Sequence, residues 1–108
     1  MSRSNVTIDE ENYSFVTVSI AGRFDYRLYQ PLDDLFSKAY KWNNTICIDL
    51  SETEYLDSSA LGLLLILREK VDPDTTIKLK NPAPNVGRTL VTANFDKLFV
   101  ISDQYEGV

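Results

Sequence analysis

Hydrophobic and polar residues alternate twice near the start of the chain. Residues 6–9 follow this pattern, and residues 16–20 repeat it with valine and isoleucine on one side and threonine and serine on the other. A period of two places successive side chains on opposite faces of a β-strand. The sequence therefore predicts two neighbouring strands, with a tight turn near Asn12 and the end of the second strand at Gly22.

The pattern then changes to the period of an α-helix. Apolar side chains recur every three or four residues after Asp25, which is a suitable N-terminal cap. Pro31 is compatible with such a helix only in or near its first turn, and the asparagines at 43–44 would end the helix. The residues on its apolar face are Leu28, Leu32, Leu35, Phe36, Ala39 and Tyr40.

A strand, a loop and a second helix follow. Residues 45–50 are apolar on both sides except at one aspartate, as expected of a central strand. We predict a loop over residues 51–57. The next helix would be capped by Ser58 or Ser59 and extend to about Lys70.

The remaining chain predicts one more strand, a helix and a last strand. A turn at 72–74 precedes a strand over 75–80, and two prolines introduce a helix before a short strand within 97–102. The third helix carries Val86, Leu90, Val91 and Ala93. The whole order predicts one α/β domain over residues 1–108, with helices packed on a mixed, mostly parallel sheet.

Composition narrows the kind of protein that this chain can be. The 108 residues carry a net charge of -5 and include no histidine. An acidic chain is a poor partner for nucleic acid, which binds basic surfaces. The lack of histidine removes the commonest metal ligand and the commonest general base. We therefore expect no metal, and no other cofactor.

The longest apolar run and the single cysteine indicate where the protein resides. Residues 60–67 are far fewer than the roughly 20 apolar residues that span a bilayer, and the first ten residues lack the apolar core of a signal peptide. Cys47 lies in the predicted central strand, where a buried, unreactive thiol is expected. These features predict a cytoplasmic protein that does not insert into a membrane.

Three consecutive polar residues, Asp57, Ser58 and Ser59, stand at the start of the second helix. Capping is the simplest interpretation, but one residue suffices for it and at least one hydroxyl is left over. A nucleophilic serine would need a base, but the chain has no histidine and no lysine is near in sequence. A phosphate acceptor is the third interpretation, because the amides and the dipole at a helix N-terminus favour negative charge.

The helix behind these residues is apolar almost all round. Leucine, isoleucine and alanine occupy nearly every position from 60 to 67. One stripe of this helix can pack on the sheet. The sequence leaves open whether the rest is covered by neighbouring elements or exposed as a contact surface.

The segment "ICIDLSETEYLDSSALGLLLIL", residues 46–67, resembles the STAS domain, and especially the small bacterial anti-sigma factor antagonists. "AGRFDYR", residues 21–27, is similar to the family's Gly-x-apolar-Asp element, and residues 81–102 are similar to its third helix and last strand. The resemblance implies a binding protein of a partner-switching pathway, not an enzyme. Its unphosphorylated form would bind a serine kinase, or anti-sigma factor, of the histidine-kinase-like ATPase type.

The resemblance also assigns roles to individual residues. It implies that phosphorylation of Ser58 ends the binding and that a phosphatase of the PP2C type restores it. Asp25 and Asp57 match the acidic residues beside the acceptor, Ser59 matches the second hydroxyl position, and Gly62 matches the family's glycine. The residues expected to flank the acceptor or bind the partner are Asp25, Asp57, Ser59, Ala60, Leu61, Gly62 and Leu63.

The chain departs from the family pattern at three places. Ala60 replaces the commoner glycine, and Arg23 stands where an acidic residue is frequent, which would alter the choice of partner. The seven residues from 102 to 108 are too few for the usual C-terminal helix, so we expect that helix to be absent.

Two other functions remain as alternatives. One is a constitutive STAS subunit of a larger complex, such as a lipid-transport ABC assembly, which would use the same apolar helix without phosphate. The other is a sensor of a small ligand or nucleotide, although the chain lacks a glycine-rich phosphate loop. Tyr26, Tyr29, Tyr40 and Trp42 on or near the first helix are interpreted as core or boundary residues.

Overall fold

A five-stranded mixed sheet forms the centre of the molecule. The computed structural model describes residues 6–12, 15–39 and 45–102. The first two strands pair antiparallel and all other pairs are parallel. In spatial order the strands are β1 (Val6–Asn12), β2 (Phe15–Ile20), β4 (Thr45–Asp49), β6 (Thr76–Lys80) and β7 (Val100–Ser102).

A second, two-stranded sheet joins β3 (Gly22–Phe24) to β5 (Thr53–Leu56) in parallel. The sequence prediction was wrong at both places, because it ended a strand at Gly22 and assigned residues 51–57 to a loop. Gly22 has φ 77°, a left-handed conformation that glycine adopts readily, so the chain turns sharply between β2 and the start of β3. The Gly22 N–H donates to the Glu52 carbonyl at 2.8 Å. Thr53 is buried, and its hydroxyl donates to the Ile20 carbonyl at 2.7 Å.

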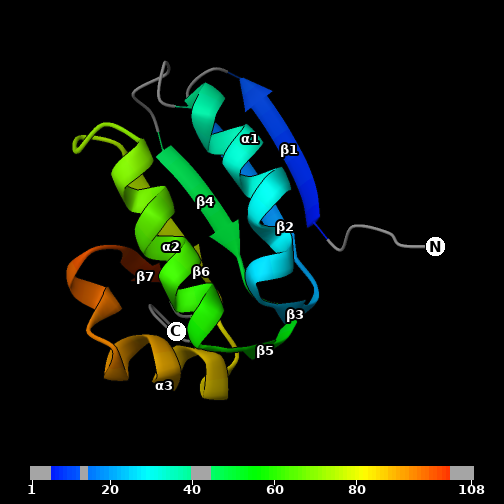
Figure 1. Ribbon diagram of the computed structural model, residues 1–108, viewed down its shortest axis with the longest axis vertical. Helices are drawn as coiled ribbons and strands as arrows, with labels where there is room; N and C mark the ends of the chain where they lie inside the picture. The colour runs from blue at the N-terminus through cyan, green and yellow to red at the C-terminus, as the bar shows by residue number, and fades with distance from the viewer. Residues whose placement is uncertain (1–5, 13–14, 40–44, 103–108) are drawn as a thin grey trace.

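Three α-helices complete the described chain, and Figure 1 shows how they are arranged. The helices α1 (Tyr29–Ala39) and α2 (Ser58–Lys70) lie side by side across one face of the sheet. The third helix, α3 (Pro84–Thr92), lies across the end of the sheet where α2 begins. Short 3-10 turns, η1 (Tyr26–Leu28) and η2 (Phe95–Lys97), precede α1 and follow α3.

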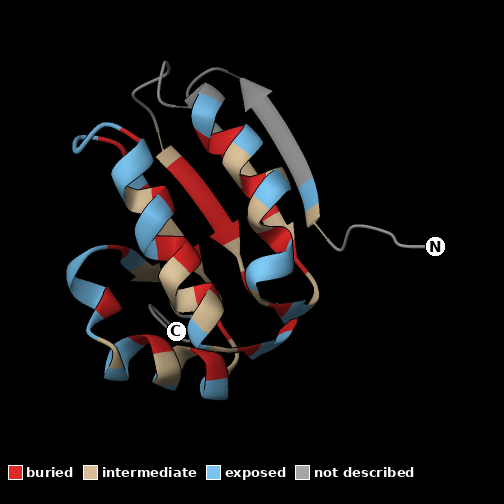
Figure 2. Cartoon of the chain, in the orientation of Figure 1, coloured by how far each residue is buried: buried red, intermediate tan, exposed pale blue. Residues whose placement is uncertain are grey.

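The hydrophobic core lies between the sheet and the helices α1 and α2. Figure 2 shows β4 buried along most of its length behind these helices. Ile46, Cys47 and Ile48 are at most 1% exposed, which confirms β4 as the predicted central strand. Burial raises the pKa of the Cys47 thiol, as the prediction of an unreactive cysteine requires.

The apolar face predicted for α1 is largely confirmed. Leu32, Leu35 and Phe36 are at most 1% exposed and Leu28, in η1, is 6% exposed. Each such side chain stabilises the fold by about 1.5–3 kcal/mol through removal from water. On α3, Val86 and Leu90 are buried in the same way, whereas Val91 is 52% exposed.

Several predictions fall outside the described residues. These concern the helix end at 43–44, the placement of Tyr40 and Trp42, and the absence of a helix after residue 102. Residues 95–99, in contrast, lie within the described chain, and there the predicted last strand begins later than expected. Residues 95–97 form η2, and β7 starts at Val100.

Candidate functional site

The start of α2 is organised by Asp57. This residue is the N-cap, with an extended backbone at φ -109° and ψ -176°, and its carboxylate accepts the Ala60 N–H at 3.0 Å. The prediction that Ser58 or Ser59 caps the helix is therefore wrong. Both serines lie inside the first turn, and the carboxylate satisfies a free amide that would otherwise lack a partner.

The Ser59 hydroxyl makes two hydrogen bonds within the domain, one as donor and one as acceptor. It donates to the Asp57 carboxylate at 2.6 Å and accepts the backbone N–H of Tyr26 at 3.0 Å. Tyr26 precedes Ser59 by 33 positions in the chain, so this hydroxyl ties the η1 turn to the start of α2. Figure 1 shows both segments at the same end of the molecule.

Ser58 differs from Ser59 in its exposure and in its hydrogen bonding. Its side chain is exposed, and no hydrogen bond joins it to any other residue in the described part of the chain. Of the two adjacent hydroxyls, Ser58 presents the one that a second molecule can reach. Whether a kinase uses it stays a prediction.

Asp25 occupies the other side of the site. It caps η1 rather than α1, because its carboxylate accepts the Arg27 N–H at 3.0 Å. The Nε atoms of Arg23 and Arg27 also approach it, at 3.1 Å and 3.0 Å. The bonds from Arg27, and less strongly those from Arg23, lower the pKa of Asp25, so this carboxylate is charged at neutral pH.

Asp57 is held in its charged form as well. The Ser59 hydroxyl and then the Ala60 N–H lower the pKa of Asp57, because both donate to the carboxylate. The nearby charge of Asp25 acts in the opposite direction. Asp25 and Asp57 are thus close enough to influence one another, as the prediction of two acidic residues beside the acceptor requires.

Exposed aromatic rings surround this polar centre. Tyr26 is 54% exposed and stacks on Tyr29 with ring centroids 5.4 Å apart. Tyr55, on β5, is 47% exposed and lies beneath the Arg23 guanidinium at 4.6 Å. The interpretation of Tyr26 as a core or boundary residue is wrong. Tyr55 was missed because no local pattern indicates that residues 53–56 form a strand beside the site.

The two sides of α2 face different surroundings. We call Ala60, Leu63, Leu64 and Leu67 the inner face, because all four are 0% exposed. We call Leu61, Gly62, Leu65 and Ile66 the outer face, on which Leu65 and Ile66 remain 43% and 45% exposed. Ala60 and Leu63 were expected to flank the acceptor or contact a partner. Their side chains instead pack in the core, so only Leu61 and Gly62 among the expected apolar residues can be reached.

The outer face borders a groove next to α3. Leu61 from α2 and Arg88, Thr89, Thr92 and Ala93 from the α3 segment line a hollow of about 330 Å³. Arg88 therefore lies at the border between α2 and α3. The groove extends the exposed surface from the outer face of α2 toward α3.

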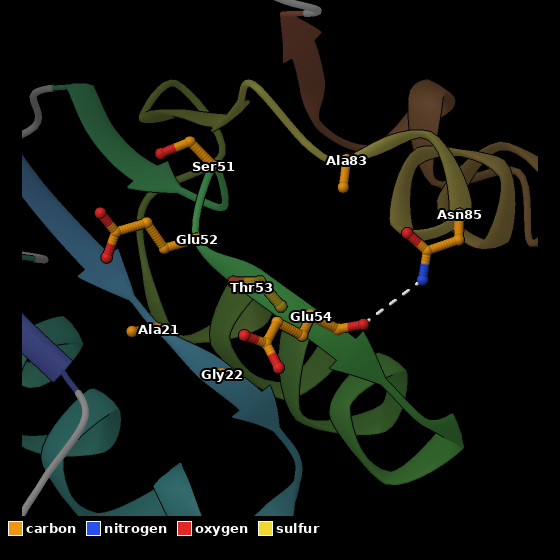
Figure 3. Close-up of a pocket in the computed structure, with 8 residues that line it drawn as sticks. All are labelled: Ala21, Gly22, Ser51, Glu52, Thr53, Glu54, Ala83 and Asn85. Atoms are coloured by element: carbon orange, nitrogen blue, oxygen red, sulfur yellow. Dashed lines mark hydrogen bonds between the residues drawn. The ribbon is translucent and has the colours of Figure 1, made fainter.

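A second hollow lies at the far end of the β3–β5 sheet. Figure 3 shows Gly22, Thr53 and Asn85 around it, with the Asn85 amide donating to the Glu54 carbonyl at 3.4 Å. Its volume is about 590 Å³ and it is open to solvent. Within the described residues, the hollow contains no buried polar side chain that lacks a partner, so it indicates no particular ligand.

No group of three or more acidic or cysteine side chains in the described ranges is arranged to hold a metal ion. None of the helices described here combines the length and apolar character that crossing a bilayer demands.

Comparisons with known proteins agree with this architecture. A STAS-domain containing protein of Pseudomonas aeruginosa (strain UCBPP-PA14) is 39% identical over 88 residues, which cover 81% of this chain and 87% of that protein. Among solved structures, an anti-sigma factor antagonist from Mycobacterium paratuberculosis superposes with a TM-score of 0.74 at 22% identity, covering 90% of this chain and 83% of that one.

The anti-sigma factor antagonist SpoIIAA has the same fold. Its unphosphorylated form matches with a TM-score of 0.68 at 17% identity, over 94% of this chain and 90% of that one. The phosphorylated form from Bacillus gives 0.67 at 17% identity, over 94% of both chains. The predicted likeness to the fold of the anti-sigma factor antagonists is therefore confirmed. The family described as "Mlab, STAS domain" matches residues 9–101, and the chain belongs to this STAS domain family.

Proposed function

We propose that this chain is a regulatory binding protein whose attachment to a partner is ended by phosphorylation of Ser58. The observation that carries the proposal is the contrast between two adjacent hydroxyls. The Ser59 hydroxyl is bonded to Asp57 and to the Tyr26 backbone, whereas the Ser58 side chain is exposed and its hydroxyl makes no hydrogen bond within the described residues. The existence of SpoIIAA in phosphorylated and unphosphorylated forms supports the same role for a related fold.

The chain itself does not carry out the phosphoryl transfer. A kinase would transfer the γ-phosphoryl group of ATP to the Ser58 oxygen, releasing ADP while a base takes the hydroxyl proton. We expect that base to come from the kinase. We expect a serine kinase, or anti-sigma factor, of the histidine-kinase-like ATPase type, a PP2C-type phosphatase to reverse the step, and a location in the cytoplasm.

The surface around Ser58 suits a protein partner. Tyr26 and Tyr55 provide exposed aromatic rings, and Leu65 and Ile66 provide exposed aliphatic side chains. Aromatic and aliphatic residues of this kind form the centres of protein interfaces. A phosphate at Ser58 adds about 1.5 to 2 negative charges at the edge of such an interface, where desolvation and repulsion oppose docking.

The test compares Ser58→Asp with Ser58→Ala. We expect Ser58→Asp to weaken binding of the cognate kinase at least about tenfold, or ~1.4 kcal/mol. The Ser58→Ala variant should bind the kinase like the unphosphorylated chain. Isothermal titration calorimetry measures both. Ser37→Asp is the matched control, because Ser37 is an exposed serine on α1 and receives the same charge away from the site.

Two outcomes would contradict the proposal. If Ser58→Asp and Ser58→Ala bind the kinase equally well, charge at position 58 does not control binding. A kinase that adds phosphate to Ser58→Ala, detected as intact mass after incubation with ATP, would move the acceptor elsewhere. Thermal unfolding must show that each variant keeps its stability within about 0.5 kcal/mol, as expected for exposed positions.

A constitutive subunit of a larger complex, such as a lipid-transport ABC assembly, is the second candidate. The exposed outer face of α2 favours it, because Leu65 and Ile66 can dock without any phosphate chemistry. In that case Ser58→Asp leaves assembly unchanged, whereas Leu65→Ser weakens it. Under the first proposal both substitutions weaken binding.

A further inference from the structure

Two arginines, Arg23 and Arg27, share the Asp25 carboxylate in the segment that is hydrogen-bonded to the start of α2. Arg23 Nε lies 3.1 Å from Asp25 Oδ2, and Arg27 Nε lies 3.0 Å from Oδ1 and 3.2 Å from Oδ2. The Asp25 side chain is only 13% exposed, whereas that of Arg27 is 72% exposed. The carboxylate is therefore turned inward and the guanidinium group of Arg27 outward, where it can meet a second anion.

The segment that carries Arg27 is fastened to the residues on both sides of Ser58. The Tyr26 N–H, one residue before Arg27, donates to Ser59 at 3.0 Å, and Ser59 in turn donates to Asp57 at 2.6 Å. Asp57 and Ser59 immediately precede and follow Ser58. The Asp57 carboxylate also adds to the rise in the pKa of Arg27, after the larger effect of Asp25, so the two charges act on each other.

Charge balance leaves room for a phosphate here. Asp25 and Asp57 contribute two negative charges, and Arg23 and Arg27 contribute two positive ones, although the chain as a whole carries -5. Within the described residues, the guanidinium group of Arg27 contacts Asp25 through Nε, which leaves its terminal nitrogens to donate to another anion. A guanidinium group binds phosphate through paired, charge-assisted hydrogen bonds.

We propose that Arg27 is the intramolecular receptor for the phosphate on Ser58. Its guanidinium group bridges Asp25 and the phosphate, while Arg23 stays with Asp25 and the Tyr55 ring. This inference rests on the proposed function, because it takes Ser58 as the acceptor. The inference adds that a residue of this chain, and not of the partner, holds the phosphate in place. After phosphorylation, Arg27 would no longer be free to contact a partner that it bound before.

The test needs no kinase. Phosphoserine is incorporated at position 58 during translation, and ³¹P NMR follows the second ionisation of the phosphate, which has an ordinary pKa of about 6. Contact with Arg27 favours the dianion, so we expect this pKa to lie lower in the phosphorylated chain than in its Arg27→Gln variant, by about half a pH unit or more.

Two arginine variants serve as controls. Arg68→Gln removes the same charge near the other end of α2, where Arg68 donates to the Asp72 carbonyl, and it should leave the phosphate pKa unchanged. Arg27→Lys keeps the charge but loses the paired hydrogen bonds, so it should give an intermediate value. Thermal unfolding of each variant shows whether the fold is kept.

The results separate this inference from the proposed function. If the phosphate pKa is the same with and without Arg27, or responds to Arg23→Gln alone, the assignment of Arg27 is overturned. The same phosphorylated chain is then titrated with the cognate kinase. If phosphorylation abolishes kinase binding but the phosphate pKa does not depend on Arg27, the role of Arg27 is overturned and the proposed switch stands. If the phosphate pKa depends on Arg27 but the phosphorylated chain still binds the kinase, the role of Arg27 stands and the proposed switch is overturned.

Discussion

The two faces of α2 carry the same kinds of side chain in different surroundings. Every residue of the inner face is 0% exposed, whereas Leu65 and Ile66 on the outer face are 43% and 45% exposed. The inner face packs entirely in the core, whereas Leu65 and Ile66 on the outer face leave part of their apolar surface in water. The difference shows that hydrophobicity alone does not identify the residues that hold this fold together.

The adjacent leucines Leu64 and Leu65 allow the sharpest test of this comparison. Leu64→Ala should lower the free energy of unfolding by about 2–5 kcal/mol, because it opens a cavity in a packed core. Leu65→Ala should change it by only about 0.5 kcal/mol. Urea denaturation measures both. Comparable losses would mean that the outer face is packed against the rest of the domain.

Gly62 on the outer face provides the second test. A methyl group added there would meet no atom within 4 Å apart from its chain neighbours and the backbone of its own helix, and helix interiors favour alanine over glycine. Gly62→Ala should therefore raise the free energy of unfolding by roughly 0.5–1 kcal/mol. If a partner helix or backbone lies close to this position, the same variant should bind the kinase more weakly although it is more stable.

A stabilised Gly62→Ala variant that binds as well as the original chain would place the partner elsewhere on the outer face. Loss of stability would instead indicate that the helix is constrained at this point. Chemical denaturation and kinase titration of the same sample distinguish these results.

The smallest expected effect concerns Asp57, where the two faces of α2 begin. Its pKa is lower in the folded protein than the ordinary 3.8, so its charge stabilises the fold. This contribution is complete above the ordinary pKa and is lost as the pH falls through the lower, folded value. Asp57→Asn keeps a capping group without a titratable charge.

We therefore expect the melting temperature of the original chain to fall more steeply than that of Asp57→Asn below about pH 4. Calorimetric scans across the acid range measure the two slopes. Parallel curves would mean that the hydrogen bonds from Ser59 and Ala60 do not favour the charged carboxylate. Asp25→Asn is a useful companion, because the pKa of Asp25 is lowered in the same direction.

Much of the fold follows from local pattern. Ile46 and Ile48 mark a buried strand, and Ile77 and Leu79 mark its neighbour, because the alternation and the apolar runs match the burial that the structure shows. The family resemblance of residues 46–67 also predicted the type of domain correctly. These features depend on residues close together in the chain.

The parts that sequence reasoning missed depend on contacts between distant residues. The strand β5 has a polar sequence and exists because it pairs with β3, about thirty residues earlier. Ser59 reaches Tyr26 across a similar separation, so the sequence could not tell which serine remains accessible. The outer face of α2 could not be told from the inner face until the position of the sheet was known.

The strands of the main sheet lie side by side in the order in which they occur along the chain. An antiparallel hairpin comes first, and each later strand joins the same advancing edge. During synthesis, every strand of this sheet that leaves the ribosome therefore finds its neighbour already made. The sheet can assemble outward in one direction, and no strand has to insert between two that are already paired.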